Sequence, residues 1–337
     1  MSDPASRAAA VTGPGGAGHA DLVDAVLAWW QGARVTRDLL PWRRTRDPWE
    51  ILLAETMLAQ TSVGRAAGRY ADLVAAFPTA RDCATATIGD VVRAWAGLGY
   101  NRRALGLHAA ARAIVERHQG AVPSTLRELV ALPGVGPYTA RAILATAFGL
   151  DAAAVDTNVG RVLARAVAGR PLGRAEAQRM ADELVPEGRS RDWNLAVMDF
   201  GSLVCQSRRP LCATCPLSRL GACAWRSALH GPDGRGAASG GDGGAGSAPG
   251  GGLRACLAPD PAVGSAGVTG RQSRFAGSDR EGRGRIVRAA CDGPVLPDQL
   301  ARITGWNGDE ERSRRVTASL VADGLLVRGP AGELRLP

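Results

Sequence analysis

The sequence predicts an all-α protein with a small additional domain at its C-terminal end. From Asp21 to about Val204, apolar residues recur at three- and four-residue spacing, the pattern of helices with one buried face. Gly, Pro or Asn interrupts this pattern at short intervals, as turns between helices do. Nothing in the stretch alternates between apolar and polar residues in the way that strands do. We therefore expect a helical domain over residues 20–204.

Each helix of this domain is expected between two successive breakers. Residues 1–19 come before the first of them, are rich in Gly, Ala and Pro, and are expected to be disordered. The periodicity places helices near 21–31, 48–60, 64–76, 88–97, 101–118, 124–131, 137–148, 157–168, 174–185 and 192–204.

The chain after this domain changes composition twice. Residues 205–226 carry four cysteines and are expected to form a loop. Residues 227–282 are rich in Gly, Ala, Ser and Pro, the composition of a flexible linker. Residues 283–337 are expected to form a winged-helix-like domain, since three short helices and a hairpin fit that motif. Its arginine-bearing helix near Asp309–Leu320 fits the groove of DNA or a merely solvated face equally well.

The charge of the chain points to a polyanionic partner. The 337 residues carry a net charge of +9, and all 41 basic residues are Arg because the sequence contains no Lys. Apart from the terminal amine, no Schiff-base nucleophile is therefore available. No apolar run approaches the length of a membrane span, and the first twenty residues lack a signal-peptide core. We expect a cytoplasmic, nucleoid-associated protein without a membrane partner.

A glycine-rich turn between two helices is the first candidate site. Pro133 ends one helix, Gly134 and Gly136 allow a tight turn, and Pro137 suits the first turn of the next helix. Free backbone N–H groups and the positive end of a helix make such a tip an anion site, most plausibly for a phosphodiester. An ordinary tight turn is the alternative.

Two carboxyl groups are candidates for glycosidic-bond chemistry. Glu55 lies in a nearly continuous apolar run, where desolvation raises the pKa of a carboxyl and suits a general acid. Asp156 and Asn158 open the helix 157–168, where the helix N-terminus favours an ionised carboxylate. One acid and one carboxylate with separate environments divide the roles in this chemistry. A structural Glu paired with a core Arg, and simple helix caps, are the alternatives.

The four cysteines indicate a metal centre. Disulfides are not expected in an intracellular helical protein. Zinc sites usually have paired short spacings, whereas the spacings here are six, two and seven residues, which an iron–sulfur cluster tolerates. The expected ligands of a [4Fe-4S] cluster are Cys205, Cys212, Cys215 and Cys223.

Six motifs in one order resemble the A/G-mismatch adenine DNA glycosylases of the helix-hairpin-helix, iron–sulfur branch of base-excision repair, in an actinobacterial type with a short C-terminal part. They are Pro41-Trp42-Arg43, the helix Glu55–Thr61, Leu98-Gly99-Tyr100, Leu132–Ala140, Val155–Val159 and the cysteine loop.

The resemblance assigns roles to individual residues. It implies that Glu55 protonates the adenine and that Asp156 stabilises the oxocarbenium-like sugar, with Tyr138 and Asn158 in support. It implies a pocket for the extruded adenine at Trp42 and Arg43. The residues implied to contact DNA are Gln60 and Tyr100 as wedges, and Leu132, Gly134, Val135, Gly136 and Thr139 in the hairpin.

The resemblance implies a monomer that removes adenine opposite 8-oxoguanine or guanine in double-stranded DNA. Related bifunctional enzymes have a Lys where this chain has Tyr138, so a monofunctional enzyme is expected. The chain departs from the family pattern at Ala59, at Leu195 and in the last cysteine spacing, and its C-terminal part is too short for the Nudix-like domain of most members. Two other functions stay open: a thymine or uracil mismatch glycosylase, and a non-catalytic iron–sulfur DNA-binding protein.

Overall fold

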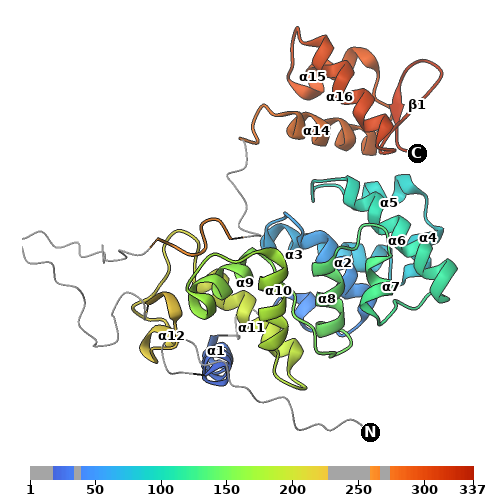
Figure 1. The fold of residues 1–337 in the computed structure, drawn as a ribbon. Helices are drawn as coiled ribbons and strands as arrows, with labels where there is room; N and C mark the ends of the chain where they lie inside the picture. The colour runs from blue at the N-terminus through green and yellow to red at the C-terminus, as the bar shows by residue number, and fades with distance from the viewer. Residues whose placement is uncertain (1–17, 34–38, 227–258, 266–273) are drawn as a thin grey trace, which may run out of the picture. The chain divides into compact units, whose positions relative to one another are not determined.

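The structure is a computed structural model that describes residues 18–33, 39–226, 259–265 and 274–337. Residues 1–17 of the segment expected to be disordered, and most of the expected linker 227–282, lie outside these ranges. Gly18 and His19 are described, and a helix already begins at His19. The described part is mostly helical, as the sequence predicts (Figure 1). Its contacts divide the chain into two units. One unit comprises residues 1–36 and 149–270, and the other residues 37–148 and 271–337.

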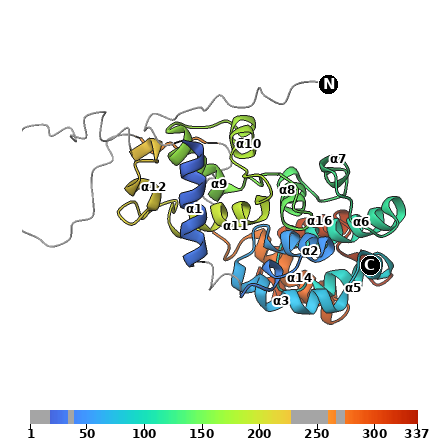
Figure 2. The ribbon, with the colours of Figure 1, turned by 90° about the horizontal axis from the view of Figure 1, so that it is seen from below.

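The first unit is built around five helical segments and the cysteine loop. Their bounds are α1 His19–Ala33, α9 Thr157–Val162 with the π-helical turn Leu163–Ala168, α10 Arg174–Glu183, α11 Ser190–Leu203 and α12 Pro216–Arg219. Helix α1 packs against α11 and α12 (Figure 2). Trp29 of α1 meets Phe200 of α11 edge to face at 5.3 Å, and the neighbouring Trp30 donates to Asp199. Cys215, Cys223 and Trp225 belong to the same buried core, so the cysteine loop is anchored in it.

The second unit contains the remaining helices of the predicted helical domain. They are η2 Pro41–Arg43, α2 Pro48–Leu58, α3 Val63–Ala76, α4 Ala80–Thr85, α5 Ile88–Ala94, α6 Arg102–His118, α7 Leu126–Val130 and α8 Pro137–Thr146. Helix α2 packs against α3 and α8, and α6 packs against α4 and α5. Helix α4 was not predicted from the sequence. Thr79 and Asp82 form a capping box at its start, and a capping box is a local signal for a helix.

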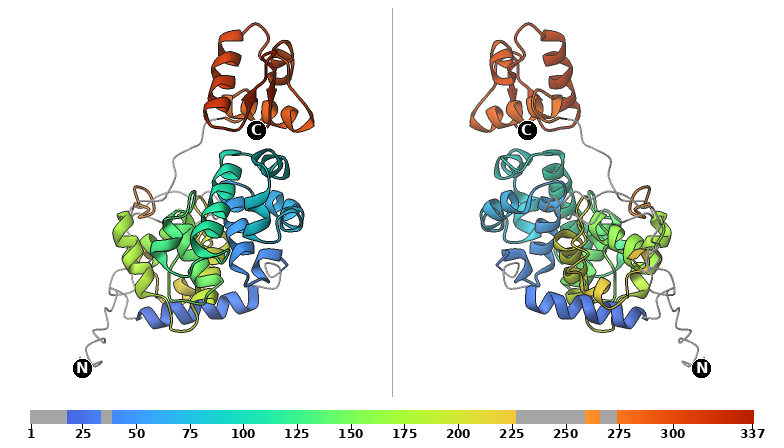
Figure 3. Two further views of the ribbon diagram at one scale, coloured as in Figure 1. Left: turned by 90° about the vertical axis from the view of Figure 1, so that its right-hand side faces the viewer. Right: turned by 90° about the vertical axis from the view of Figure 1, so that its left-hand side faces the viewer.

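The C-terminal residues form three helical segments and a hairpin, which gather into one bundle (Figure 3). These are α14 Asp279–Asp292, η4 Pro297–Gln299 continued by α15 Leu300–Thr304, and α16 Glu310–Ala322. Strand β1 Val327–Arg328 pairs antiparallel with β2 Leu334–Arg335. Helix α14 begins four residues before the predicted domain start because Ser278 caps it by accepting the N–H of Glu281. No helix in the described ranges is long and apolar enough to cross a membrane.

Candidate active site

The predicted hairpin joins α7 to α8 and gives its two glycines different tasks. Gly134 has a φ of +75°, and a Cβ built there would lie 3.2 Å from the Cα of Gly106 on α6, so a side chain would be both strained and tightly packed. Gly136 has an extended backbone with φ −89°, and nothing lies within 4 Å of a Cβ built on it. Gly134 therefore shapes the turn, whereas Gly136 leaves open space beside the first N–H groups of α8.

Some residues around the hairpin tip are buried and anchor it, whereas its two glycines are exposed. Leu132 and Val135 are buried and hold the hairpin to the unit, and Thr139 is half-buried in the first turn of α8. Gly134 and Gly136 are exposed. The tip thus presents backbone to solvent, as an anion site at a helix N-terminus requires.

Replacing Gly134 by Ala is expected to affect mainly stability, whereas replacing Gly136 by Ala is expected to affect mainly DNA binding. Gly134→Ala should lower the free energy of unfolding by about 1–2 kcal/mol, because an L-residue is strained at positive φ. Gly136→Ala should lower it by about 0.5–1 kcal/mol, because Gly136 is the N-cap of α8 and Ala is less favourable than Gly there, and should weaken DNA binding several-fold. Chemical denaturation and titration of a fluorescent duplex measure the two effects. Wild-type DNA affinity in Gly136→Ala would show that the tip does not contact the phosphate backbone.

Glu55 and Tyr138 lie on the contacting helices α2 and α8. Ile51, Leu52 and Met57 of α2 are buried, and Glu55 is half-buried beside them. The run is therefore as apolar as the sequence predicts, while Glu55 keeps partial access to solvent. Such access suits a carboxyl that must exchange a proton with a substrate.

Asp156 caps helix α9 with its whole carboxylate. One oxygen accepts the backbone N–H groups of Asn158 and Val159 at 2.9 and 2.8 Å, and the other accepts the Asn158 side-chain amide at 2.8 Å. The sequence predicts that the helix end favours the ionised form. Burial outweighs these bonds and raises the pKa of Asp156 above its usual range. Asp156 and Asn158 belong to the first unit, whereas Glu55 and Tyr138 belong to the second.

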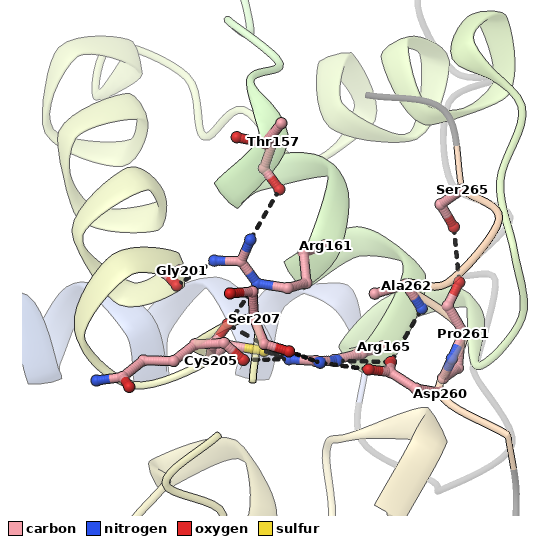
Figure 4. Close-up of polar contacts among 11 residues, drawn as sticks. Thr157, Arg161, Arg165, Gly201, Cys205, Ser207, Asp260, Pro261, Ala262 and Ser265 are labelled. Atoms are coloured by element: carbon pink, nitrogen blue, oxygen red, sulfur yellow. Dashed lines mark hydrogen bonds and ion pairs between the residues drawn. The ribbon is translucent and has the colours of Figure 1, made fainter. Parts of the chain in front are cut away.

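Arg161 and Gly201 hold Asn158 in place, and neither was predicted from the sequence. Arg161 donates to the Asn158 side-chain oxygen at 2.8 Å. Through Nε it also donates to the carbonyl of Cys205 at 2.7 Å (Figure 4). A Cβ on Gly201 of α11 would lie 2.8 Å from the Cβ of Asn158, so only glycine fits where α11 passes α9. A single Arg within the apolar positions of α9 is the signal that could have found Arg161.

Gln60 and Tyr100 share an unusual backbone. Both are exposed, with φ of +63° and +48°, a conformation that non-glycine residues seldom adopt and that is often kept at functional sites. The guanidinium of Arg103, also missed from the sequence, joins their loops by donating to Met57 and Gly99 carbonyls at 2.9 and 3.0 Å. It also lies 5.5 Å from the centre of the Tyr100 ring. Arg103 therefore fixes the two predicted wedges relative to each other.

The predicted base pocket has one well-defined wall. Trp42 meets the ring of Tyr70 edge to face at 5.7 Å, and the Tyr70 hydroxyl donates to Glu50 at 3.0 Å. Burial and the nearby Glu50 carboxylate raise the pKa of Tyr70, which stays a neutral donor. Trp42 and Arg43 are half-buried in the short η2 helix.

The four predicted ligand cysteines line one cavity. Cys205, Cys212, Cys215 and Cys223 share it with Phe200, Leu217 and Trp225. Burial raises the pKa of Cys215, and raises that of Cys223 to about 12, so the two free thiols are neutral. Across the described residues, no three His, Cys, Asp or Glu side chains form a site for a metal ion. Cysteine is the residue type that binds iron–sulfur clusters, and the buried thiols need a cation to ionise.

The chain is similar to known DNA repair proteins. Residues 53–187 match the family described as HhH-GPD superfamily base excision DNA repair protein. An adenine DNA glycosylase of Mycobacterium tuberculosis strain H37Rv is 37% identical over 337 residues, covering 97% of this chain and 96% of the relative. The chain belongs to the adenine DNA glycosylase family. It is a base-excision DNA glycosylase, and its partner is DNA.

Other glycosylases resemble this chain over a shorter stretch. The thymine/uracil-DNA glycosylase of Methanothermobacter thermautotrophicus is 34% identical over 204 residues, 59% of this chain and 91% of that relative. A solved thermostable thymine-DNA glycosylase superposes with a TM-score of 0.57 and 30% identity, over 62% of this chain and 97% of that one. An endonuclease III–DNA complex, at a TM-score of 0.53 and 24% identity, shares the fold. The helix-hairpin-helix glycosylase fold predicted from the motifs is thereby confirmed.

Proposed function

We propose that this glycosylase releases adenine that is mispaired with 8-oxoguanine or guanine. One observation carries the choice of base: the similarity to an adenine DNA glycosylase extends over 97% of the chain, whereas that to a thymine/uracil-DNA glycosylase covers 59%. The similarity to the adenine DNA glycosylase therefore extends into the C-terminal residues 283–337. The thymine or uracil mismatch activity is the alternative, because that relative resembles the helical part at 34% identity.

The proposed chemistry divides between two carboxyl groups. Glu55, half-buried on α2, protonates the adenine ring and turns the base into a leaving group. Asp156 stabilises the positive charge that develops on the sugar as the glycosidic bond breaks, and water then adds to the sugar. The developing cation favours the ionised form of Asp156, which burial disfavours in the free protein. Asn158 and Arg161 orient this carboxylate through the bonds described above.

We propose that the reaction stops at an abasic site. Lyase chemistry needs an amine that attacks the sugar, and the chain has Tyr138 after its hairpin and no Lys at any position. Tyr138 lies in the first turn of α8 and has no amine to attack the sugar.

The proposed contacts with DNA surround the extruded base. The hairpin tip, with Gly136 and Thr139 at the start of α8, holds a backbone phosphate. Gln60 and Tyr100 fill the gap in the duplex, and Trp42 with Arg43 receives the base. The left-handed backbones of Gln60 and Tyr100, joined through Arg103, support this role because they keep both side chains exposed.

We propose that Cys205, Cys212, Cys215 and Cys223 hold a [4Fe-4S] cluster. Their shared cavity and their anchoring in the core of the first unit support this assignment. When bound, such a cluster ties the two ends of the 205–226 loop together through iron–thiolate bonds. Purified protein should absorb near 400 nm, at the order of magnitude expected for thiolate-bound iron. A colourless protein loaded with zinc would contradict the assignment.

A mismatch panel tests the proposed activity. Duplexes with A opposite 8-oxoguanine, A opposite G, T opposite G and U opposite G are incubated with the enzyme under single-turnover conditions. Adenine release from the first two is expected, and strands should break only after alkali treatment, because the abasic site stays intact. Release confined to T:G or U:G would replace the proposed substrate, and strand breakage without alkali would overturn the monofunctional assignment.

A further inference from the structure

A short turn far along the chain contacts Arg165 and Leu172 of the first unit. Residues 259–265 fold back on themselves: Asp260 accepts the N–H of Ala262 at 3.0 Å, and the Ser265 hydroxyl donates to the Pro261 carbonyl at 2.7 Å (Figure 4). The same hydroxyl accepts the N–H of Leu172 at 3.1 Å. Ala262 and Ser265 are only 4% and 5% exposed. The turn is thus part of the first unit, although the sequence places it within a linker.

Arg165 connects this turn to the first cysteine. Its side chain, 2% exposed, donates through Nε and Nη2 to the two carboxylate oxygens of Asp260 at 2.8 and 2.5 Å. Its other donors reach the carbonyls of Gln206 and Ser207 at 2.7 and 3.1 Å and the Cys205 sulfur at 3.6 Å. One buried guanidinium therefore holds three consecutive residues of the loop and the turn at the same time.

Asp260 is the ion-pair partner of Arg165, so the link that Arg165 makes between the turn and the cysteine loop depends on Asp260. A buried guanidinium is stable only with a partner of opposite charge, and losing that partner is strongly destabilising. Burial opposes ionisation of Asp260, but the hydrogen bonds from Arg165 outweigh it and hold the pKa of the carboxyl below its usual range. Without Asp260, Arg165 gains stability by moving toward water and so releases the carbonyls of the loop.

We propose that Asp260 is a positioning residue that keeps the cysteine loop closed, so that the 259–265 turn controls how long the iron–sulfur cluster is retained. The inference rests on the proposed cluster. Release of residues 205–207 exposes the Cys205 corner of the site, where water, oxygen and chelators reach the iron. None of these residues is among those proposed to contact DNA or the base. Arg161 also donates to the Cys205 carbonyl, so opening of the loop loosens the support of Asn158 as well.

Asp260→Asn in the full-length protein tests this role. After EDTA is added in air, the absorbance near 400 nm should decay about 10-fold faster than in wild type, in the range typical for loss of a residue that supports a metal ligand. Ser265→Ala removes the other anchor of the turn without touching Arg165 and should accelerate the decay less. The matched control is Glu176→Gln, which breaks the Arg170–Glu176 pair in the same unit, with a similarly exposed carboxylate of 31% against 26% for Asp260. It should decay as wild type does.

Hydrogen exchange of the same proteins gives a readout that needs no cluster. Peptides covering 205–207 and 259–265 should exchange faster in Asp260→Asn than in wild type, and equally fast in Glu176→Gln and wild type. Unchanged exchange and unchanged decay in Asp260→Asn would overturn the proposal, as would equal acceleration in Glu176→Gln. A colourless protein would refute the cluster, and exchange alone would then decide whether Asp260 closes the loop.

Discussion

Replacing Glu55 by Gln is expected to slow base release by about 10²–10⁴-fold, the contribution of a positioned general acid. Gln keeps the size and the hydrogen-bonding capacity of the side chain on α2, but it has no proton to give to the leaving base. Affinity for a mismatched duplex should stay within a few-fold of wild type, because the change removes no positive charge. Single-turnover assays and duplex titrations measure the two quantities.

The control for this substitution is Glu116→Gln on α6, an exposed Glu that pairs with Arg112 at 3.3 Å. It should release adenine at the wild-type rate. If Glu55→Gln is equally active, Glu55 is a structural residue and the two-carboxyl mechanism is wrong. Activity that is absent in both the wild type and the variant, with DNA binding intact, would favour the non-catalytic DNA-binding protein instead.

Replacing Asp156 by Asn is expected to abolish most base release while stabilising the fold at neutral pH. The loss of activity, of an order similar to that for Glu55, follows because Asn cannot carry the negative charge that stabilises the sugar cation. The gain in stability follows from burial, which raises the pKa of Asp156 in the folded protein. An amide caps a helix about as well as a carboxylate does, so α9 should keep its start.

The pH dependence of this stability difference has a defined sign. Between the ordinary Asp pKa of about 3.9 and the raised folded value, the native state binds more protons than the unfolded state, so wild-type stability falls as pH rises. The free energy of unfolding of Asp156→Asn should therefore exceed that of wild type at pH 8, and the difference should shrink toward pH 4. Urea titrations at both pH values measure it. Asp47→Asn, at the exposed cap of α2, should show a smaller difference. A variant that is less stable than wild type at pH 8 would mean that the hydrogen bonds to Asp156 outweigh its burial.

Local signals were sufficient for most of the helices and for the hairpin turn. Pro133, Gly134 and Pro137 determine a turn through their own backbone preferences, and the structure has that turn between α7 and α8. Asp156 likewise caps α9 as its position before the helix predicts. The short helix α4 was missed because six residues offer too little periodicity, and only its capping box marks it.

Contacts over long distances in the chain could not be predicted. Gly134 requires its hydrogen side chain because of Gly106, and Gly201 because of Asn158, and neither neighbour is near in sequence. Arg103 fixes the backbones of two loops through contacts with residues up to 47 positions away. In the sequence, Gly201 looks like an ordinary helix glycine and Arg103 like a surface Arg.

The sequence by itself determined the helical class, the hairpin, the two candidate carboxyls, the four cysteines and, through their order, the glycosylase family, because each depends on residue types at short spacing. Only the tertiary structure decided that burial opposes the ionisation of Asp156, that the four cysteines line one cavity, and that Asp260 pairs with Arg165 across 95 positions. The physical reason is that desolvation and ion pairing depend on what surrounds a group in space, and packing brings those neighbours from distant parts of the chain.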